Sequence, residues 1–286
     1  MITIFTPAYN RADTLPRLYE SLCRQQRFDF EWVIVDDGST DNTSETVRGF
    51  GGDQNFPIIY HKQENGGKHR AINRGLILAK GELFIIVDSD DYLTDDATKL
   101  IEEQFEEIRD RADIAGVSFR RGFSSTDVIG TQNAFEDSVC NVFAFRYRMK
   151  IAGDMAEVYK TEVLRKYPFP EFEGEKFCPE ALVWNRIGRD YDMLWTSQIV
   201  YICEYLEGGL TDRIVEIRKN SPTATLVHYA ELEKANIPLY YKVRANINFW
   251  RFARHSKLDF GRKLGMVSPL HSIVGLPTGL LYSYLR

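Results

Sequence analysis

The sequence predicts an α/β fold in which a mostly parallel sheet is covered by helices on both faces. Over the first 120 of the 286 residues, short apolar runs alternate with segments of helical periodicity, which is typical of crossover units that join parallel strands. The run at 83–87 is apolar throughout, as expected of a strand buried on both faces. With 44% hydrophobic and 27% charged residues, a chain of this length can form a core without disulfides or a structural metal.

Apolar spacing and turn residues place the elements of the first 120 residues. Strands are expected over residues 2–5, 31–35, 57–61, 83–87 and 114–119. Helices are expected over residues 14–25, 42–49, 67–79 and 95–110. In the first helix Leu15, Leu18 and Leu22 recur every three or four residues, so they share one helix face. Thr40 or Asp41 can cap the second helix, since both side chains accept hydrogen bonds from free amide groups.

The alternation fades after residue 120. A polar stretch at 122–130 precedes an irregular aromatic region. Further strands are expected at 154–159 and 193–202, and further helices at 179–189 and within 222–252, where Pro238 separates two segments. The segment 207–211 contains two glycines and is expected to be a loop.

The charge balance limits the classes of partner. The chain has 36 basic and 41 acidic residues and a net charge of −5, which argues against nucleic acid as the main partner. Its four cysteines are widely spaced, so reduced thiols are expected rather than a zinc site or disulfides. The N-terminus has neither a basic segment nor a small-residue cleavage site, and a cytoplasmic location is therefore expected.

Polar or acidic residues follow three of the expected strands, at the edge where ligands of such sheets bind. The most acidic of these ends is Asp88, Ser89, Asp90 and Asp91, directly after the apolar run at 83–87. Carboxylates are hard ligands of the kind that Mg²⁺ and Mn²⁺ prefer, and a metal there could bridge to phosphate oxygens and neutralise a leaving diphosphate. The alternative is a turn followed by an acidic helix start, which the helix dipole favours.

Two other segments offer nucleotide contacts, each with a simple structural alternative. Asp36 and Asp37 end the second expected strand, where a carboxylate can accept a hydrogen bond from a nucleobase or a ribose hydroxyl, or can serve a turn and a helix cap. Glycines at 66 and 67 precede a helix that begins with Lys68, an arrangement that can place a cation near a diphosphate. The spacing does not fit the phosphate-binding loop of nucleoside triphosphatases, because His69 stands where Ser or Thr is required. His69 is equally well explained as a structural histidine.

Taken in this order, the segments resemble the inverting family-two glycosyltransferases, which have the GT-A fold. The resemblance is close from residue 3 to about residue 93 and looser over 180–186 and 205–211. It rests on Thr6-Pro7-Ala8-Tyr9-Asn10-Arg11, Val35-Asp36-Asp37-Gly38-Ser39-Thr40-Asp41, Asn65-Gly66-Gly67 with 71–75, Gly81-Glu82, and Asp88-Ser89-Asp90-Asp91. Each motif is short, but their combination in this order is highly specific.

The resemblance implies a nucleotide-diphosphate-sugar donor, with a UDP-sugar as the expected form, and Mg²⁺ or Mn²⁺ as the cofactor. By position, Asp37 would accept a hydrogen bond from the base, Asp88 would hold the ribose side and Asp90 would bind the metal. Thr6, Ala8 and Tyr9 would line the base. The full set of expected donor-binding residues is Thr6, Pro7, Ala8, Tyr9, Arg11, Asp37, Gly67, Lys68, Arg70, Asn73, Asp88 and Ser89.

The resemblance also implies Glu180 as the catalytic base. In this family the base opens a later helix, often in a Glu-Asp pair followed by Trp and Arg, and the matching segment is Pro179-Glu180-Ala181-Leu182-Val183-Trp184-Asn185-Arg186. Because Pro179 replaces the usual Glu, Glu175 and Asp154 remain alternatives. Ile72 stands where many members carry Arg, and Lys68 or Arg70 can take over that contact. The QxxRW signature of processive synthases is absent, so single sugar additions are expected.

The implied activity is that of a metal-dependent, inverting and non-processive hexosyltransferase acting on a hydroxyl of a glycan or lipid-linked glycan. Residues 1–120 would bind the nucleotide sugar, 121–220 would form the acceptor and catalytic-base half of the same domain, and 221–286 a helical extension. The loop at 207–213 could close over both substrates or be an ordinary surface loop. A second copy of the chain is a candidate partner.

Two other functional classes stay open. The run ending in Asp88 and Asp90 also looks like the aspartate motif of haloacid-dehalogenase-type phosphatases, although that family carries it on its first strand. A glycan-binding or assembly module could retain the same scaffold without catalysis.

The C-terminal tail differs from the rest in charge and polarity. Residues 242–286 contain eight basic residues and one acidic residue, a net charge of +7, whereas residues 1–241 carry −12. The 22 positions 264–285 contain no Asp, Glu, Lys or Arg. They could span a membrane by length, but five Pro and Gly residues are expected to interrupt a helix there. We therefore expect a peripheral segment on the cytoplasmic face of a membrane, with cations at anionic headgroups. The apolar contacts would be Leu270, Ile273, Val274, Leu276, Leu280 and Leu281. The alternative is packing on the catalytic domain or on a second subunit.

Overall fold

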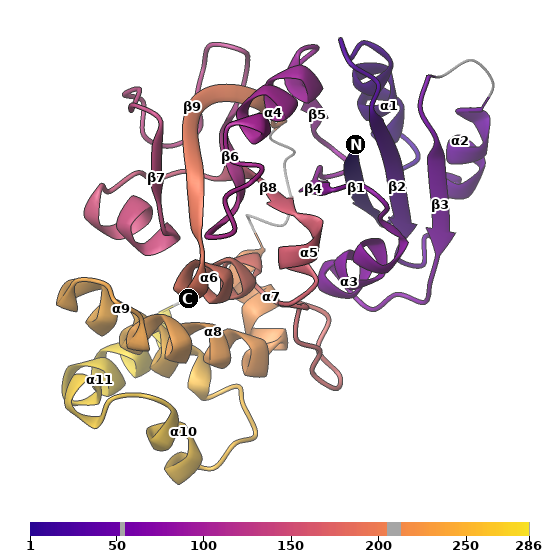
Figure 1. Ribbon diagram of the computed structural model, residues 1–286. Coiled ribbons are helices and arrows are strands. Elements are labelled where there is room, and N and C mark those ends of the chain that lie inside the picture. The colour runs from indigo at the N-terminus through magenta and orange to yellow at the C-terminus, as the bar shows by residue number, and fades with distance from the viewer. Residues whose placement is uncertain (52–54, 205–212, 286) are drawn as a thin grey trace.

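The computed structural model describes residues 1–51, 55–204 and 213–285, and within them one nine-stranded sheet forms the centre of the molecule (Figure 1). The strand order is β3-β2-β1-β4-β8-β6-β9-β5, and β7 also pairs with β9. The strands are β1 Ile2–Ala8, β2 Phe30–Asp36, β3 Ile58–Lys62, β4 Leu83–Ile86, β5 Tyr92–Leu93, β6 Ile114–Gly122, β7 Ser138–Cys140, β8 Met155–Lys160 and β9 Asp192–Ile202. Strands β1, β2, β3, β4, β6 and β9 run in one direction and β5, β7 and β8 in the other. The predicted mostly parallel α/β sheet is confirmed.

Helices cover both faces of this sheet, as predicted. On one face, α1 (Leu15–Cys23), α2 (Thr43–Gly49) and α4 (Ala97–Glu106) contribute to one cluster of buried apolar side chains. On the other face, a second cluster contains side chains of α3 (Lys68–Leu78), α5 (Thr161–Leu164) and α6 (Glu180–Asp190), together with Phe145 of a π-helical turn at Ala144–Arg148. The apolar face of each helix is thus buried against the sheet. This packing holds in place the strand ends that the polar motifs follow.

Five helices follow the sheet and gather at one end of the molecule (Figure 1). They are α7 Ile214–Asn220, α8 Pro222–Lys234, α9 Leu239–Ala253, α10 Phe260–Met266 and α11 Pro269–Leu285. Leu226, Phe249 and Trp250 belong to a third apolar cluster that these helices share. The break between α8 and α9 lies just before Pro238, as the sequence predicts.

The C-terminal segment is interrupted directly before Pro269, where α10 ends and α11 begins across a bend of 119°. The interruption expected further along is wrong, since α11 is one helix of 17 residues that includes Pro277. Pro269 occupies its first position, where the missing amide hydrogen has no helical acceptor. Two glycines lie where the helix crosses α9: an added Cβ would stand 1.9 Å from Asn246 Oδ1 at Gly275 and 2.5 Å from the Ile247 carbonyl oxygen at Gly279. The glycines therefore permit a close helix contact instead of breaking the helix.

Other differences concern short or undescribed segments. Some strands and helices were not predicted from the sequence because each has at most seven residues, too few to show a periodicity. They are β5, β7, α5, α7 and α10. The expected loop at 207–211 lies outside the described residues. In the part of the chain that the structure describes, no single helix meets the length and hydropathy of a membrane span; Phe260–Met266 and Pro269–Tyr284 meet them only together, across a bend of 119°.

Candidate active site

A single lysine joins two carboxylates from distant parts of the chain. Lys68, the first residue of α3, places its Nζ 2.5 Å from Asp88 Oδ1 and 2.7 Å from Glu180 Oε1. Asp88 follows β4, and Glu180 is the first residue of α6. Burial lowers the pKa of Lys68, but the two carboxylates outweigh burial and raise this pKa above its ordinary value. Lys68 therefore stays charged and holds the end of β4 beside the start of α6.

Asp88 is held by further contacts at the same sheet edge. Arg121 Nη1, near the end of β6, lies 3.8 Å from Asp88 Oδ2. Burial raises the pKa of Asp88, whereas Lys68 and Arg121 lower it, and the net direction is down. The Tyr201 hydroxyl accepts a hydrogen bond from the Asp88 amide at 2.9 Å and donates one to Asp91 Oδ2 at 2.8 Å. Arg121 in turn lies over the Tyr201 ring, 4.1 Å from its centre, so the strand end is rigidly placed.

The two remaining aspartates of the motif have different surroundings. Asp91 is buried, and burial is the main reason that its pKa rises to about 6. The Asp90 side chain is 26% exposed, and its ion pair is a loose one, with Arg11 Nη2 at 3.7 Å. Arg11 Nε donates to Ser89 Oγ at 3.1 Å. Asp90 is thus the carboxylate of this motif that is best placed to accept an incoming ligand.

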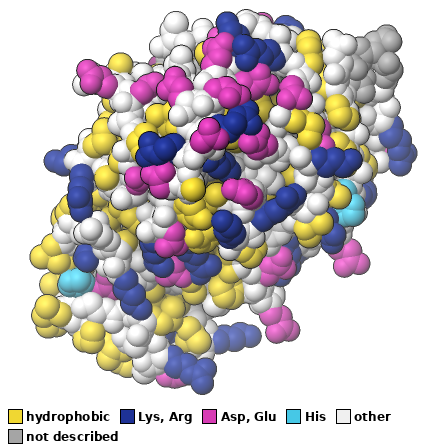
Figure 2. Space-filling model, viewed as in Figure 1, with side chains coloured by type: hydrophobic (Ala, Val, Ile, Leu, Met, Phe, Trp, Pro, Cys, Tyr) yellow, Lys and Arg dark blue, Asp and Glu magenta, His cyan; other side chains and the backbone are white. Residues whose placement is uncertain are grey.

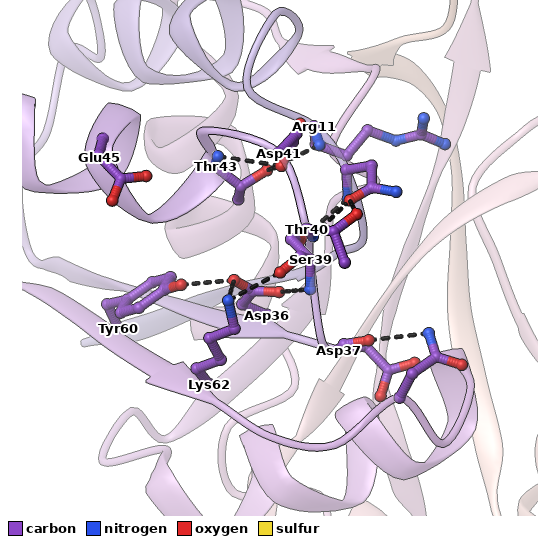
Figure 3. Close-up of polar contacts among 12 residues, drawn as sticks. Arg11, Asp36, Asp37, Ser39, Thr40, Asp41, Thr43, Glu45, Tyr60 and Lys62 are labelled. Atoms are coloured by element: carbon purple, nitrogen blue, oxygen red, sulfur yellow. Dashed lines mark hydrogen bonds and ion pairs between the residues drawn. The ribbon is translucent and has the colours of Figure 1, made fainter.

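Asp36 serves the turn after its strand, which is the structural alternative to a nucleotide contact (Figure 3). It is fully buried, and its Oδ1 accepts the Ser39 amide at 2.7 Å. Its Oδ2 accepts the Tyr60 hydroxyl and lies 3.8 Å from Lys62 Nζ. These contacts close the turn after β2 and leave Asp36 no role in ligand binding.

Asp37 ties that turn to the glycine loop before α3. Its carboxylate accepts the amides of Gly66 at 2.9 Å and Gly67 at 2.7 Å, and the Gln63 side chain at 2.8 Å. Gly67 has a φ of +98°, and a Cβ there would stand 1.9 Å from the Lys176 carbonyl oxygen, so only glycine fits. Asp37 thus sets the position of the loop that leads into Lys68.

We expect Asp37→Ala to lower the free energy of unfolding by about 1–3 kcal/mol, because the Gly66 and Gly67 amides would lose their buried acceptor. Chemical denaturation of the variant and the wild type measures this difference. Asp41→Ala is the matched control, since Asp41 accepts backbone amides in the same turn but at an exposed position. An unfolding free energy equal to that of the wild type would mean that Asp37 does not hold the loop.

Several of the residues expected to bind the donor are engaged elsewhere in the fold. Thr6 is fully buried and its Oγ1 accepts the Trp32 indole N–H at 2.9 Å. Arg70 donates to Glu171 at 3.2 Å, and Asn73 forms hydrogen bonds with both backbone groups of Phe169, each at 2.9 Å. Ala8 is buried as well. The Thr6 hydroxyl is buried in the core, which corrects its expected role as a donor contact. Arg70 and Asn73 hold the 169–172 segment, and their donor contacts stay predictions.

The alternatives to Glu180 are also placed by the structure. Glu175 is buried, and its oxygens accept the amides of Thr223 at 2.6 Å and Ala224 at 2.9 Å at the start of α8. It is therefore a helix cap. Asp154 is exposed, just before β8. Of the three acids, Glu180 is the one that contacts Lys68.

Glu157 is an acid at this site that sequence reasoning missed, and its side chain is 12% exposed. It lies on β8, 3.7 Å from Arg146 Nη2. Burial is the largest effect on its pKa; Arg146 and Arg121 lower it, Glu180 raises it, and the result is about 7. In the sequence it is one polar residue within an apolar strand, a pattern that carries no functional signal by itself.

We expect Glu157→Gln to stabilise the protein at pH 8 and to leave its stability nearly unchanged at pH 5. Between the ordinary pKa of 4.5 and about 7, the folded state binds the Glu157 proton more tightly than the unfolded state, so stability falls as pH rises through this range. The difference at pH 8 is about 3 kcal/mol at most. Denaturant titrations at both pH values test this, with the exposed Glu162→Gln on α5 as control. A stability gain of the same size at both pH values would contradict the ionisation of Glu157.

Arg121 and Tyr201 were also missed, although a signal existed for both. Each lies near the carboxyl end of a strand, Arg121 on β6 and Tyr201 on β9. The rule that directed attention to the aspartates applies to these strand ends too. Arg121 was overlooked because β6 extends beyond the predicted strand at 114–119. Tyr201 lies within the predicted strand at 193–202, near its end, and was overlooked all the same.

A sequence profile of Glycosyl transferase family 2 matches residues 3–167, more than half of the chain. Glycosyltransferase GlyG of Streptococcus pneumoniae serotype 4 is 35% identical over 107 residues, which are 37% of this chain and 36% of that protein. Chondroitin synthase of Pasteurella multocida is 38% identical over 105 residues, 37% of this chain and 11% of that protein. The matched segments thus span about a third of the first relative and about a tenth of the second.

Solved structures resemble the chain over nearly its whole length. S. aureus TarS 1–349 in complex with UDP-GlcNAc superposes with a TM-score of 0.64 and 20% identity, covering 98% of this chain and 79% of that one. Mannosyltransferase PcManGT from Pyrobaculum calidifontis, in complex with GDP-Man and Mn²⁺, gives a TM-score of 0.59 and 18% identity, covering 99% and 86%. At this identity the likeness concerns the fold, while the sequence profile concerns the family. The chain belongs to glycosyl transferase family 2 and has the GT-A fold.

Proposed function

We propose that the chain is a metal-dependent, inverting and non-processive hexosyltransferase. It would move one sugar from a nucleotide-diphosphate-sugar, with a UDP-sugar as the expected donor, to a hydroxyl of a glycan or lipid-linked glycan. The observation that carries the proposal is the contact of Lys68 with both Asp88 and Glu180, because it brings a donor-side strand end and a candidate base within reach of one side chain. The fold shared with structures that contain UDP-GlcNAc, UDP or GDP-Man supports the choice of donor class.

The proposed donor site lies at the carboxyl ends of β1 and β4. Tyr9, just after β1, is 49% exposed and can pack against a nucleobase beside Pro7. Asp88 and Ser89 would face the ribose. Arg11 and Lys68 supply positive charge for the diphosphate, and the amides at the start of α3 add to it because Lys68 opens that helix.

The residues present fit a divalent metal that the donor helps to hold. In the described ranges, no group of three or more His, Cys, Asp or Glu side chains could hold a metal ion. Mg²⁺ is commonly bound by one or two carboxylates together with substrate phosphates and water, and the partly exposed Asp90 suits that arrangement. When bound, Mg²⁺ or Mn²⁺ would supply positive charge for the departing diphosphate.

Glu180 is the proposed general base. It is the first residue of α6, where the helix dipole stabilises a carboxylate. It would take the proton of the acceptor hydroxyl as that oxygen attacks the anomeric carbon from the face opposite the nucleotide. The bond from that carbon to the phosphate oxygen breaks, and its electron pair leaves with the nucleotide diphosphate. A single displacement of this kind inverts the anomeric configuration.

Lys68 links the two halves of this site. Without a donor its ammonium neutralises Asp88 and Glu180 together. A bound diphosphate would compete for the same ammonium, and Glu180 would then be free to accept a proton. Donor binding would in this way precede activation of the acceptor.

The test is a panel of UDP- and GDP-sugars, first screened by thermal shift. A ligand present at 100 times its dissociation constant stabilises the protein by about 2.7 kcal/mol. The donors that stabilise the chain are then assayed with glycan and lipid-linked glycan acceptors in Mg²⁺ or Mn²⁺, and NMR gives the anomeric configuration of the product. We expect release of nucleotide diphosphate and an inverted product. Release of inorganic phosphate would favour the phosphatase alternative, and a chain that binds glycans but releases no nucleotide with any donor would be a binding module.

A further inference from the structure

Helix α11 presents its large apolar side chains to the outside of the molecule. Leu270, Ile273, Val274, Leu281 and Tyr284 are all exposed, Ile273 to 70%. Their spacing places them along one side of a helix with 3.6 residues per turn. These five residues are called the outer stripe. Leu276, which the sequence assigned to the same contact, instead packs against the core that the C-terminal helices share.

The opposite side of α11 carries Leu276 and small residues, and the small residues fit closely against α9. Gly275 and Gly279 leave no room for a Cβ. The Ser272 hydroxyl accepts the Trp250 indole N–H at 3.0 Å and donates to the Ser268 carbonyl at 2.8 Å. Ser283 is also buried. These contacts fix the rotation of the helix, so the outer stripe cannot turn inward without placing large side chains where glycine alone fits.

This arrangement is the reverse of an ordinary surface helix, which buries its apolar side and exposes its polar side. A contiguous apolar stripe on the outside marks a contact with a partner or a membrane. The fold therefore supplies a rigid helix whose apolar side has no cover within the described residues.

The charge around the stripe identifies the kind of surface that it meets. The tail from residue 242 onward carries +7. The nearby acids of α8 are already engaged, since Glu231 pairs with Arg186 and Glu233 is buried against His271. Arg254 lies over the ring of Tyr284 at 4.5 Å, at the end of the stripe. Figure 2 shows dark blue and yellow side chains predominating at the lower end of the molecule, where Figure 1 places the C-terminal helices.

We propose that the outer stripe docks on the surface of an anionic lipid bilayer, with α11 lying in the plane of the interface. The acyl boundary would receive the apolar side chains, and the headgroups would neutralise the surrounding cations. A two-fold dimer through the same stripe would instead bring two positively charged regions together. A bilayer contact also suits a lipid-linked acceptor, but vesicle binding needs no donor and no acceptor, so its outcome is independent of the proposed transferase activity.

Co-sedimentation of the full chain with phosphatidylglycerol-containing vesicles tests the proposal. We expect binding to these vesicles, weaker binding to phosphatidylcholine vesicles, and release as salt rises because the headgroup attraction is screened. Leu270→Gln with Ile273→Gln should lower the partition constant at least about tenfold, since two buried aliphatic side chains would be lost from the lipid contact. The single variant Ile273→Gln has a matched control in Ile77→Gln, because Ile77 on α3 is also an isoleucine that is 70% exposed. Ile77→Gln should bind like the wild type.

Three outcomes would overturn the proposal. Equal vesicle binding by the double variant and the wild type would exclude the outer stripe as the contact. A lower melting temperature of the double variant would show that the stripe packs on protein. The third outcome is a wild type that does not bind vesicles but forms a dimer in sedimentation velocity. If the double variant does not form this dimer, the stripe is a contact with a second copy of the chain.

Discussion

Replacing Asp90 by Asn is expected to lower kcat/KM at least about 10³-fold with the fold intact, because Lewis-acid stabilisation of a leaving group is worth several kcal/mol. Asn keeps the size of the side chain but lacks the negative charge that a divalent cation requires. Among the described residues, the one ion pair of the Asp90 carboxylate is the loose contact with Arg11, so the substitution removes little that stabilises the fold. The measurements are nucleotide release and the melting temperature, each in excess Mn²⁺.

Asp95→Asn is the matched control for this prediction. Asp95 follows the same segment of chain, is 59% exposed and pairs with Arg24 at 3.0 Å. Its loss should leave kcat/KM within about twofold of the wild type, as expected for an exposed ion pair. Near-normal turnover of Asp90→Asn, or undiminished turnover of the wild type in excess EDTA, would remove the metal from the account.

Replacing Glu180 by Gln is expected to lower kcat by about 10²–10⁴-fold, the usual contribution of general base catalysis. The amide oxygen of Gln can still accept a hydrogen bond from Lys68, so donor binding should be retained. Single-turnover rates and donor titrations separate the two quantities. Because Lys68 contacts Asp88 as well, the diphosphate side of the site keeps its cation in this variant.

Glu45→Gln controls for the loss of a carboxylate from a helix start. Glu45 lies in the first turn of α2, is 66% exposed and lies apart from the network at the end of β2 (Figure 3). It should have the kinetics of the wild type. A Glu180→Gln variant that loses donor affinity but keeps its rate would make Glu180 a binding residue, and the proton would then pass to another group.

The part of the site that was predictable from sequence consists of residues that follow strands. Asp88 and Asp90 were found because an apolar strand ends directly before them, and ligands of such sheets bind at that edge. The contact of Lys68 with Glu180 was not predictable, because it depends on how α6 packs against the sheet. The same limit explains why Thr6 was assigned to the donor: its motif is visible in sequence, but the direction of its side chain is set by packing.

The C-terminal helix shows a second limit. Pro277 and the glycines of residues 264–285 indicated a broken segment, since each lowers helix propensity. Contact with α9 outweighs that propensity, because Gly275 and Gly279 allow the two backbones to approach. Propensity is a local property, whereas the stability of α11 comes from tertiary packing. The sequence nevertheless predicted exposed apolar residues in this segment, and Leu270, Ile273, Val274 and Leu281 are exposed.

The central claim is that the end of β4 and the start of α3 hold a nucleotide diphosphate through Asp90, Lys68 and a divalent metal. Calorimetric titration of the wild type, Asp90→Asn and Glu180→Gln with UDP and with GDP, in Mn²⁺ and in EDTA, tests it without knowledge of the acceptor. We expect the wild type and Glu180→Gln to bind one of the two nucleotides in Mn²⁺. EDTA or Asp90→Asn should weaken this binding at least about tenfold, equivalent to about 1.4 kcal/mol. Binding that is equally tight in EDTA and in Asp90→Asn, or no binding of either nucleotide by the wild type, would contradict it.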